Sequence, residues 1–414
     1  MKIPELLLPA GSLEKMRAAF AYGADAVYAG QPRYSLRARN NEFGLAELES
    51  GIAEAHRLGK KFYVTSNLMA HNAKVKTYLA DIEPVIAMRP DALIMADPGL
   101  IMLVREKWPE TPVHLSVQAN TVNYASVNFW RSLGLTRVIL SRELSLDEIA
   151  EIRQRCPDME LEVFVHGALC IAYSGRCLLS GYFNHRDANQ GTCTNSCRWD
   201  YKVLEETEKT YVIEESQRPG ELMPIEEDEH GTYILNSKDL RAVEHVERLT
   251  QLGIDSLKIE GRTKSVYYVA RTAQVYRRAI DDAAAGRPFD PAHLGALEQL
   301  AQRGYTGGFY QRRPHTEYQN YTSGQSGGGV SQYVGDIAAF DAASGMAEIV
   351  VKNRFRVGDR LEIMTPSGNH TLTLARMETV DGEEISEAPG SGWIVRIPLA
   401  ADVNIERAML VRFV

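Results

Sequence analysis

The chain has 414 residues, of which 44% are hydrophobic and 24% are charged, and its formal net charge is −8. This length predicts two domains, one of them large, in a soluble globular protein. The composition excludes a membrane-spanning protein, because no apolar run approaches the roughly 20 residues of a span, and also a protein coated with basic surface. The start reads as a strand and not as a signal peptide, so we expect a cytoplasmic protein without membrane contacts.

The first 165 residues repeat one rhythm, in which a short apolar run is followed by an amphipathic helical pattern. The apolar runs predict strands, and the stretches between them carry apolar residues at helical spacing. Strand–helix alternation of this kind implies parallel strands joined by right-handed crossovers. The predicted strands are PELLLPAG, AVYAG, KFYVTSN, ALIMADPG, VHLSVQAN, RVILSREL and LEVFVHGA.

The same rhythm returns after residue 231. A helix is predicted in SKDLRAVEHVERLTQLG, a strand in SLKIEGR and a long helix in SVYYVARTAQVYRRAIDDAAAG. Eight strand–helix units within residues 1–310 predict an α/β fold, a TIM-like (β/α)8 barrel with a cysteine-rich insertion at about 167–231. An open doubly wound sheet is the alternative, but no glycine-rich phosphate fingerprint follows the first strand.

Beyond residue 310 the alternation of predicted strands and helices ends. Residues 311–332 are polar and glycine-rich and are interpreted as a linker. Residues 333–414 contain short β-like runs separated by turn residues, which predicts a small C-terminal β-barrel. The runs are YVGDIAAF, MAEIVVK, DRLEIMT, HTLTLAR and GWIVRIP.

Four of the five cysteines lie in one short stretch, as Cys170, Cys177, Cys193 and Cys197. A reducing compartment makes a disulfide framework the poorer explanation, and the clustering argues for a metal site. Four thiolates suit zinc or an iron–sulfur cluster, and only the last two cysteines have the close spacing typical of zinc. The spacing therefore favours iron–sulfur, with zinc as the alternative. Cys156 is expected to be an ordinary buried cysteine.

Polar residues follow the predicted strands, at the end of a barrel where active sites lie. Arg142, Lys258 and Arg262 are candidates for holding carboxylate or phosphate groups. His166 is a candidate proton donor or acceptor. Simple ion pairs with Glu143 and Glu260 at the barrel mouth are the alternative for these cations. The candidate catalytic residues are His166, Arg142, Lys258, Glu260 and Arg262.

The loop after the second strand is basic. It is interpreted as a contact for RNA phosphates, with a solvated loop as the alternative. The candidate RNA-binding residues are Arg37, Arg39, Asn40 and Asn41.

The stretch EVFVHGALCIAYSGRCLLS, from Glu162 to Ser180, together with NQGTCTNSCRW and SLKIEGRTKS, resembles the collagenase-like peptidase family U32, and within it the branch that hydroxylates tRNA. The resemblance covers nearly the whole chain. It implies an oxidoreductase that forms 5-hydroxyuridine at the wobble position of tRNA, without molecular oxygen and with prephenate or a derivative as cosubstrate. It also implies an iron–sulfur cluster of the 4Fe-4S type on the four clustered cysteines.

Two other functions stay open at this point. One is the collagenase-like peptidase activity of the family label, which no recognisable nucleophile, base or catalytic zinc constellation supports. The other is a non-catalytic RNA-binding or cluster-delivery protein. The expected partners are tRNA and a small carboxylate cosubstrate, and the sequence names neither an electron donor nor a protein partner.

Overall fold

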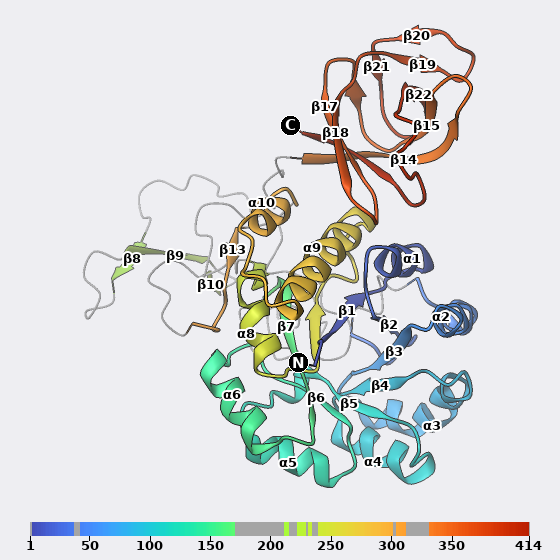
Figure 1. Cartoon of the computed structure of the whole chain (residues 1–414). Helices are drawn as coiled ribbons and strands as arrows, with labels where there is room; N and C mark the ends of the chain where they lie inside the picture. The colour runs from blue at the N-terminus through green and yellow to red at the C-terminus, as the bar shows by residue number, and fades with distance from the viewer. Residues whose placement is uncertain are drawn as a thin grey trace.

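A computed structural model of the chain describes residues 2–36, 42–169, 211–214, 222–228, 231–233, 239–300, 304–311 and 331–413, with the backbone alone between 211 and 233. It contains a parallel β-barrel surrounded by helices and a separate antiparallel β domain at the C-terminus (Figure 1). The predicted TIM-like fold followed by a small β domain is confirmed.

Eight parallel strands form the barrel, and each corresponds to one of the predicted apolar runs, although β7 begins one residue earlier than predicted. The sheet closes because β12 pairs with both β1 and β7. Parallel strands place all their carboxyl ends at one face, which we call the barrel mouth. The strands are β1 (Glu5–Pro9), β2 (Ala26–Gly30), β3 (Lys61–Ser66), β4 (Ala92–Met95), β5 (Val113–Leu115), β6 (Arg137–Ile139), β7 (Glu160–Ala168) and β12 (Ser256–Ile259).

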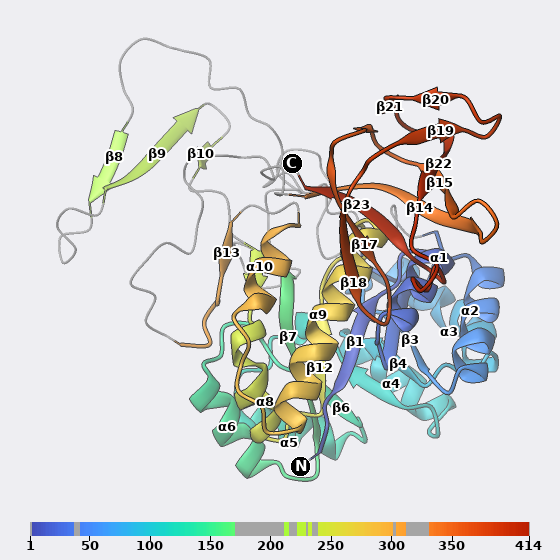
Figure 2. The same ribbon diagram turned by 45° about the horizontal axis from the view of Figure 1, so that its top comes forward.

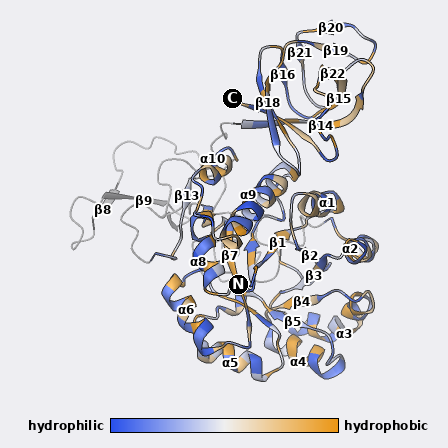
Figure 3. Ribbon diagram, in the orientation of Figure 1, coloured by the Kyte–Doolittle hydropathy of each residue, from blue (hydrophilic) through white to orange (hydrophobic). Residues whose placement is uncertain are grey.

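Helices cover the outside of the barrel, with polar and apolar residues on different faces (Figure 3). Several begin at a side-chain cap, as at Ser12, Ser145 and Ser265, which satisfies amide groups of the first turn. None of the helices in the described ranges is long and apolar enough to cross a membrane. The helices are α1 (Leu13–Ala21), α2 (Leu45–Arg57), α3 (Asn72–Ala87), α4 (Pro98–Lys107), α5 (Tyr124–Ser132), α6 (Leu146–Arg155), α8 (Val246–Gln251), α9 (Val266–Ala284) and α10 (Ala292–Glu298).

One predicted helix is wrong in its first half. Residues Asp239–Arg241 form strand β11, and α8 begins only at Val246, after a short 3-10 turn. The cause is the length of β7, which extends past its pairing with β12. Its last residues, His166 to Ala168, find hydrogen-bond partners by pairing antiparallel with β11. Strand β13 (Tyr305–Thr306) then adds to β11 in parallel.

Most of the predicted insertion and linker lies outside the described residues. Within the insertion, the backbone forms a three-stranded antiparallel sheet of β8 (Tyr211–Glu214), β9 (Leu222–Asp228) and β10 (Gly231–Tyr233). Of the predicted linker, the structure describes Gln311 and the two residues that open β14, which begins at Ser331. The predicted boundaries at 310 and 333 stay predictions.

The C-terminal domain is built on an eight-stranded antiparallel sheet in the order β18-β17-β23-β14-β15-β22-β19-β20, with β16 and β21 as a separate pair. Its core contains Val334, Ile349, Leu361 and Val395. Strand β23 was not predicted, although it lies between β17 and β14. The strands are β14 (Ser331–Asp341), β15 (Met346–Val351), β16 (Phe355–Arg356), β17 (Arg360–Met364), β18 (Asn369–Thr373), β19 (Met377–Thr379), β20 (Glu384–Ile385), β21 (Glu387–Ala388), β22 (Ile394–Pro398) and β23 (Met409–Phe413).

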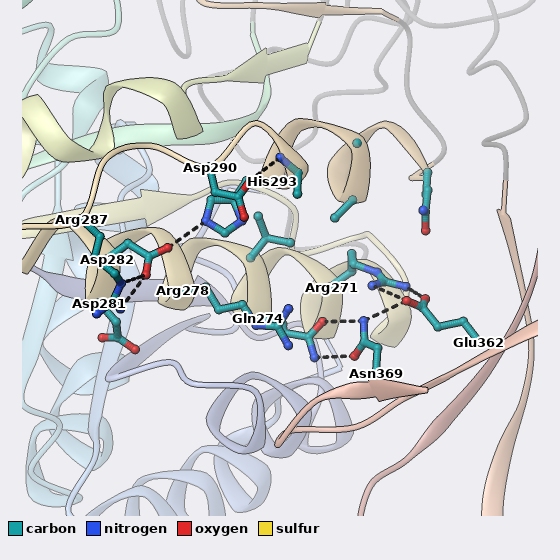
Figure 4. A pocket seen from close by; sticks show the side chains of 15 residues that line it. Arg271, Gln274, Arg278, Asp281, Asp282, Arg287, Asp290, His293, Glu362 and Asn369 are labelled. Carbon is teal, nitrogen blue, oxygen red and sulfur yellow. Dashed lines mark hydrogen bonds and ion pairs between the residues drawn. The ribbon is translucent and has the colours of Figure 1, made fainter. Parts of the chain in front are cut away.

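The two domains share a tight contact along α1 and α9 (Figure 2). The Tyr22 hydroxyl, on the residue that ends α1, donates to the carbonyl oxygens of Met364 and Arg407, each at 2.9 Å. Arg271 of α9 forms a buried ion pair with Glu362 of β17. A groove of about 670 Å³ runs beside this pair between α9, α10 and the C-terminal domain (Figure 4). The β domain is therefore docked on the barrel wall by buried polar contacts.

Candidate active site at the barrel mouth

A column of buried charged side chains occupies the barrel interior, beginning at the end of the barrel opposite the mouth. Arg137 Nη1 lies 2.7 Å from Glu5 and 3.0 Å from Glu162, and Lys258 Nζ lies 2.8 Å from Glu162. Burial raises the pKa of Glu5, but the charge and hydrogen bond of Arg137 lower it overall. Arg137 therefore holds the Glu5 carboxylate in the ionised form, and Glu162 lies between Arg137 and Lys258.

Lys258 lies inside the barrel, below the open mouth. Its ammonium group faces the rings of Tyr28, at 4.4 Å, and Phe164, at 5.5 Å, and is almost fully buried. Burial lowers the pKa of Lys258, and the attraction of Glu162 opposes this shift. Lys258, the predicted catalytic lysine, is thus paired with Glu162 in this structure, and its ammonium group faces two aromatic rings.

Arg142 and Glu260 meet at the mouth itself. Arg142 Nη2 lies 3.3 Å from the Glu260 carboxylate, and Nη1 donates to the Ala168 carbonyl oxygen at 2.8 Å. The guanidinium also lies over the Phe164 ring at 3.9 Å. The Arg142 side chain is only 9% exposed, whereas that of Glu260 is 25% exposed. Arg142 therefore fixes the main chain just before the cysteine-rich stretch.

Arg262 holds the loop that follows β2. Its Nη1 donates to Ser35 Oγ at 2.6 Å and to Thr65 Oγ1 at 3.2 Å, and its Nη2 donates to the Leu36 carbonyl. Asn67 accepts from the Leu36 amide, so the ends of β2 and β3 are tied together. Charges at strand ends are ordinarily exposed, but here Arg262 is buried and the Arg142 side chain is only 9% exposed.

His166 lies apart from the charged residues at the barrel mouth. A β-bulge shifts the register of β7 so that His166 lies opposite Ile259 and packs against α9 in the outer layer. Its ring is surrounded by three tyrosines, and Nδ1 lies 3.3 Å from the Tyr276 hydroxyl. Burial, aided by the positive charges of Lys264 and Arg241, lowers the pKa of His166 to about 3. His166 is therefore neutral, and its proton-transfer role stays a prediction.

The predicted metal ligands and RNA contacts cannot be placed from this structure. Cys170, Cys177, Cys193 and Cys197 lie outside the described residues, which stop at Leu169, one residue before the first of them. Elsewhere in the described ranges no group of three or more His, Cys, Asp or Glu side chains could hold a metal ion. Residues 37–41 are also outside, and they contain the predicted RNA contacts Arg37, Arg39, Asn40 and Asn41.

Three charged residues that organise the barrel interior were missed by the sequence analysis. Glu5, Arg137 and Glu162 were not singled out, although each stands within or at the start of a predicted strand. The signal was present in ELEVFVHGA, where Glu162 occupies a buried position of an otherwise apolar strand. A charged residue at such a position requires a buried partner.

Comparison with known proteins places the chain in a family. The description "Peptidase family U32" matches residues 11–320, and "Peptidase family U32 C-terminal domain" matches residues 330–412. The chain belongs to peptidase family U32. The first match spans the whole barrel mouth described above, and the second spans nearly all of the C-terminal β domain.

Relatives within the U32 family have curated names. The "tRNA hydroxylation protein P" of Escherichia coli (strain K12) is 60% identical over 99% of this chain and 96% of its own length. The protein of the same name from Haemophilus influenzae is 58% identical with the same coverage. The "23S rRNA 5-hydroxycytidine C2501 synthase" of E. coli is 33% identical over 82% of this chain and 47% of its own length.

Proposed function

We propose that this U32 protein hydroxylates tRNA and forms 5-hydroxyuridine at the wobble position. The observation that carries the proposal is the 60% identity to tRNA hydroxylation protein P along 99% of the chain. The relative named as a 5-hydroxycytidine synthase supports hydroxylation of a pyrimidine ring as the reaction class. The resemblance further supports an oxidoreductase reaction that uses prephenate or a derivative and no molecular oxygen.

The proposed cofactor is an iron–sulfur cluster of the 4Fe-4S type on Cys170, Cys177, Cys193 and Cys197. Four thiolates are the donor set that such a cluster takes, and the first, Cys170, comes two residues after β7 ends at the mouth. When bound, the cluster would supply electron transfer next to the reacting base. Arg142, by holding Ala168, would fix the chain that leads to the first ligand.

The residues at the mouth suit a small anion beside an extruded base. A uridine reaches an active site only when it leaves its stack, and the mouth is where this barrel class receives substrates. Glu260 is the partly exposed partner of Arg142, so a carboxylate of the cosubstrate would compete with Glu260 for the Arg142 guanidinium. Lys258, lower in the barrel, would add positive charge beneath this position.

The function is tested by complementation. We expect the gene for this chain to restore 5-hydroxyuridine in an E. coli strain that lacks its own tRNA hydroxylation protein, as measured by mass spectrometry of tRNA nucleosides. Such a strain must first be shown to lack the modification, with other hydroxylating pathways removed. Absence of the nucleoside despite expression of folded protein would contradict the proposal. Gelatin cleavage by the purified protein would instead revive the peptidase alternative.

Two arginine substitutions test the mouth. Arg142→Met or Arg262→Ala is expected to lower 5-hydroxyuridine about tenfold or more, because each removes a guanidinium that positions the mouth and its anion. Arg262 is buried and the Arg142 side chain is only 9% exposed, so a loss of stability of about 1–3 kcal/mol is also expected. The measurement is nucleoside mass spectrometry at matched levels of folded protein. Full modification by both variants at a limiting supply of prephenate would leave these arginines as structural residues only.

A further inference from the structure

Two cations stand together at the rim of the barrel mouth. Arg33 follows β2, and Lys74 lies in the first turn of α3, which follows β3. Lys74 Nζ donates to the Arg33 carbonyl oxygen at 3.3 Å, so the two residues are in direct contact. The Arg33 side chain is 59% exposed. We call Arg33 and Lys74 the rim pair.

Within the described ranges, the ion pairs of the two rim-pair cations involve a single carboxylate, that of Asp81. Asp81 lies 2.9 Å from Arg33 Nη1 and also accepts a hydrogen bond from the Tyr34 hydroxyl at 2.6 Å. The hydrogen bond from Tyr34 helps to hold the pKa of Asp81 below its ordinary value, so this carboxylate is charged. Partial burial and the charge of Arg33 lower the pKa of Lys74. The contribution of Arg33 to the lower pKa of Lys74 reflects the repulsion between the two positive charges.

The fold holds this repulsive arrangement in place. Arg33 has a backbone φ of 69°, in the left-handed region that non-glycine residues seldom adopt. The next residue, Tyr34, is fully buried, and its hydroxyl also contacts Thr77 of α3 at 2.8 Å. Strained backbone that the surrounding structure maintains is found preferentially at binding sites and active sites. The combination of strain and unbalanced charge therefore points to a ligand.

The rim pair is connected to the mouth by a short path. The Leu68 amide donates to the Tyr34 carbonyl, which joins the loops after β2 and β3. Two residues further on, the Leu36 carbonyl accepts from Arg262. The cations are thus placed on the same face as the proposed pocket for the base, at its open rim.

We propose that the rim pair binds a backbone phosphate of the tRNA, close to the nucleotide that enters the mouth. This inference rests on the proposed function and deepens it by naming a contact for the RNA substrate. Phosphates are the partners that exposed arginine and lysine side chains take in RNA complexes, and these contacts orient the nucleic acid without reading its sequence. Because the chain as a whole has a charge of −8, binding of RNA depends on local positive sites, and the rim pair is one of them.

The test is the salt dependence of tRNA binding. Arg33→Gly removes the charge and suits the positive φ, and Lys74→Ala removes the second charge. Each variant is expected to bind unmodified tRNA about threefold to tenfold more weakly at low salt. Loss of one phosphate contact should also reduce the slope of log affinity against log salt by about 0.7–0.9. Fluorescence anisotropy with labelled tRNA measures both quantities.

Lys107→Ala is the matched control. Lys107 also forms an exposed ion pair, with Glu83 at 3.0 Å, but it ends α4 at the opposite end of the barrel from the mouth. It should change neither the affinity nor the slope. Rim-pair variants that bind tRNA like Lys107→Ala would overturn the inference, even where the wild-type chain restores 5-hydroxyuridine. Failure of the wild-type chain to restore the nucleoside would count against the proposed function instead.

Discussion

Serine in place of Cys177 or Cys193 is expected to abolish both the bound iron and the formation of 5-hydroxyuridine. Protein purified without oxygen should be brown and contain about four irons per chain if all four thiolates bind one cluster. Serine is a poor ligand for iron in such clusters because it lacks the soft thiolate sulfur. The measurements are iron content, the visible absorption spectrum and nucleoside mass spectrometry.

Cys156 provides the control for this experiment. It is the fifth cysteine, fully buried at the end of α6, with its Sγ 3.5 Å from the Tyr124 carbonyl oxygen. Cys156→Ala should therefore retain the iron and the colour, at a modest cost in stability. A colourless anaerobic preparation with one zinc per chain would contradict the iron–sulfur assignment and support the zinc alternative.

The second large effect is expected from Glu162→Gln, which should lower the free energy of unfolding by about 3 kcal/mol. Glu162 is the buried carboxylate between Arg137 and Lys258, and the substitution removes the ion-pair partner of the buried Lys258 ammonium. Burial of an uncompensated charge is costly because the ion has lost its hydration. Urea unfolding followed by circular dichroism measures the change.

Glu160→Gln is the control for Glu162→Gln. Glu160 also pairs with Arg137, at 2.9 Å, but its side chain is 43% exposed whereas that of Glu162 is fully buried. Exposed ion pairs contribute little, so a loss below about 1 kcal/mol is expected. Equal losses for the two variants would show that the buried charge column does not stabilise the barrel in the way its geometry indicates.

The barrel could be predicted from sequence because its strands are short apolar runs between amphipathic helices. Each of the eight runs, from the one containing Glu5 to the one containing Lys258, became a barrel strand. Helical spacing in residues 237–253 was misleading, since Leu240 is buried by pairing with β7 and not by a helix face. Local pattern could not reveal that the end of β7 lacked a partner.

The site was less predictable than the fold. Strand ends correctly indicated which residues, such as Arg142 and Glu260, would meet at the mouth. The position of His166 depends on a bulge of one residue, which reverses the direction of a side chain and leaves no trace in the apolar pattern. The burial of Arg262 depends on Ser35, in the loop after β2, and on Thr65 of β3, which are brought close only by closure of the barrel.

The pairing of Ala168 with Asp239 has a consequence for how this family diversifies. Residues 169–238, which hold the four clustered cysteines, leave the barrel and return to it at hydrogen-bonded neighbours. The barrel therefore fixes both ends of this segment, and lengthening it costs only about 0.6 kcal/mol for each doubling. Replacement of this segment by that of a relative is therefore expected to leave the eight strands and their buried charges unaltered.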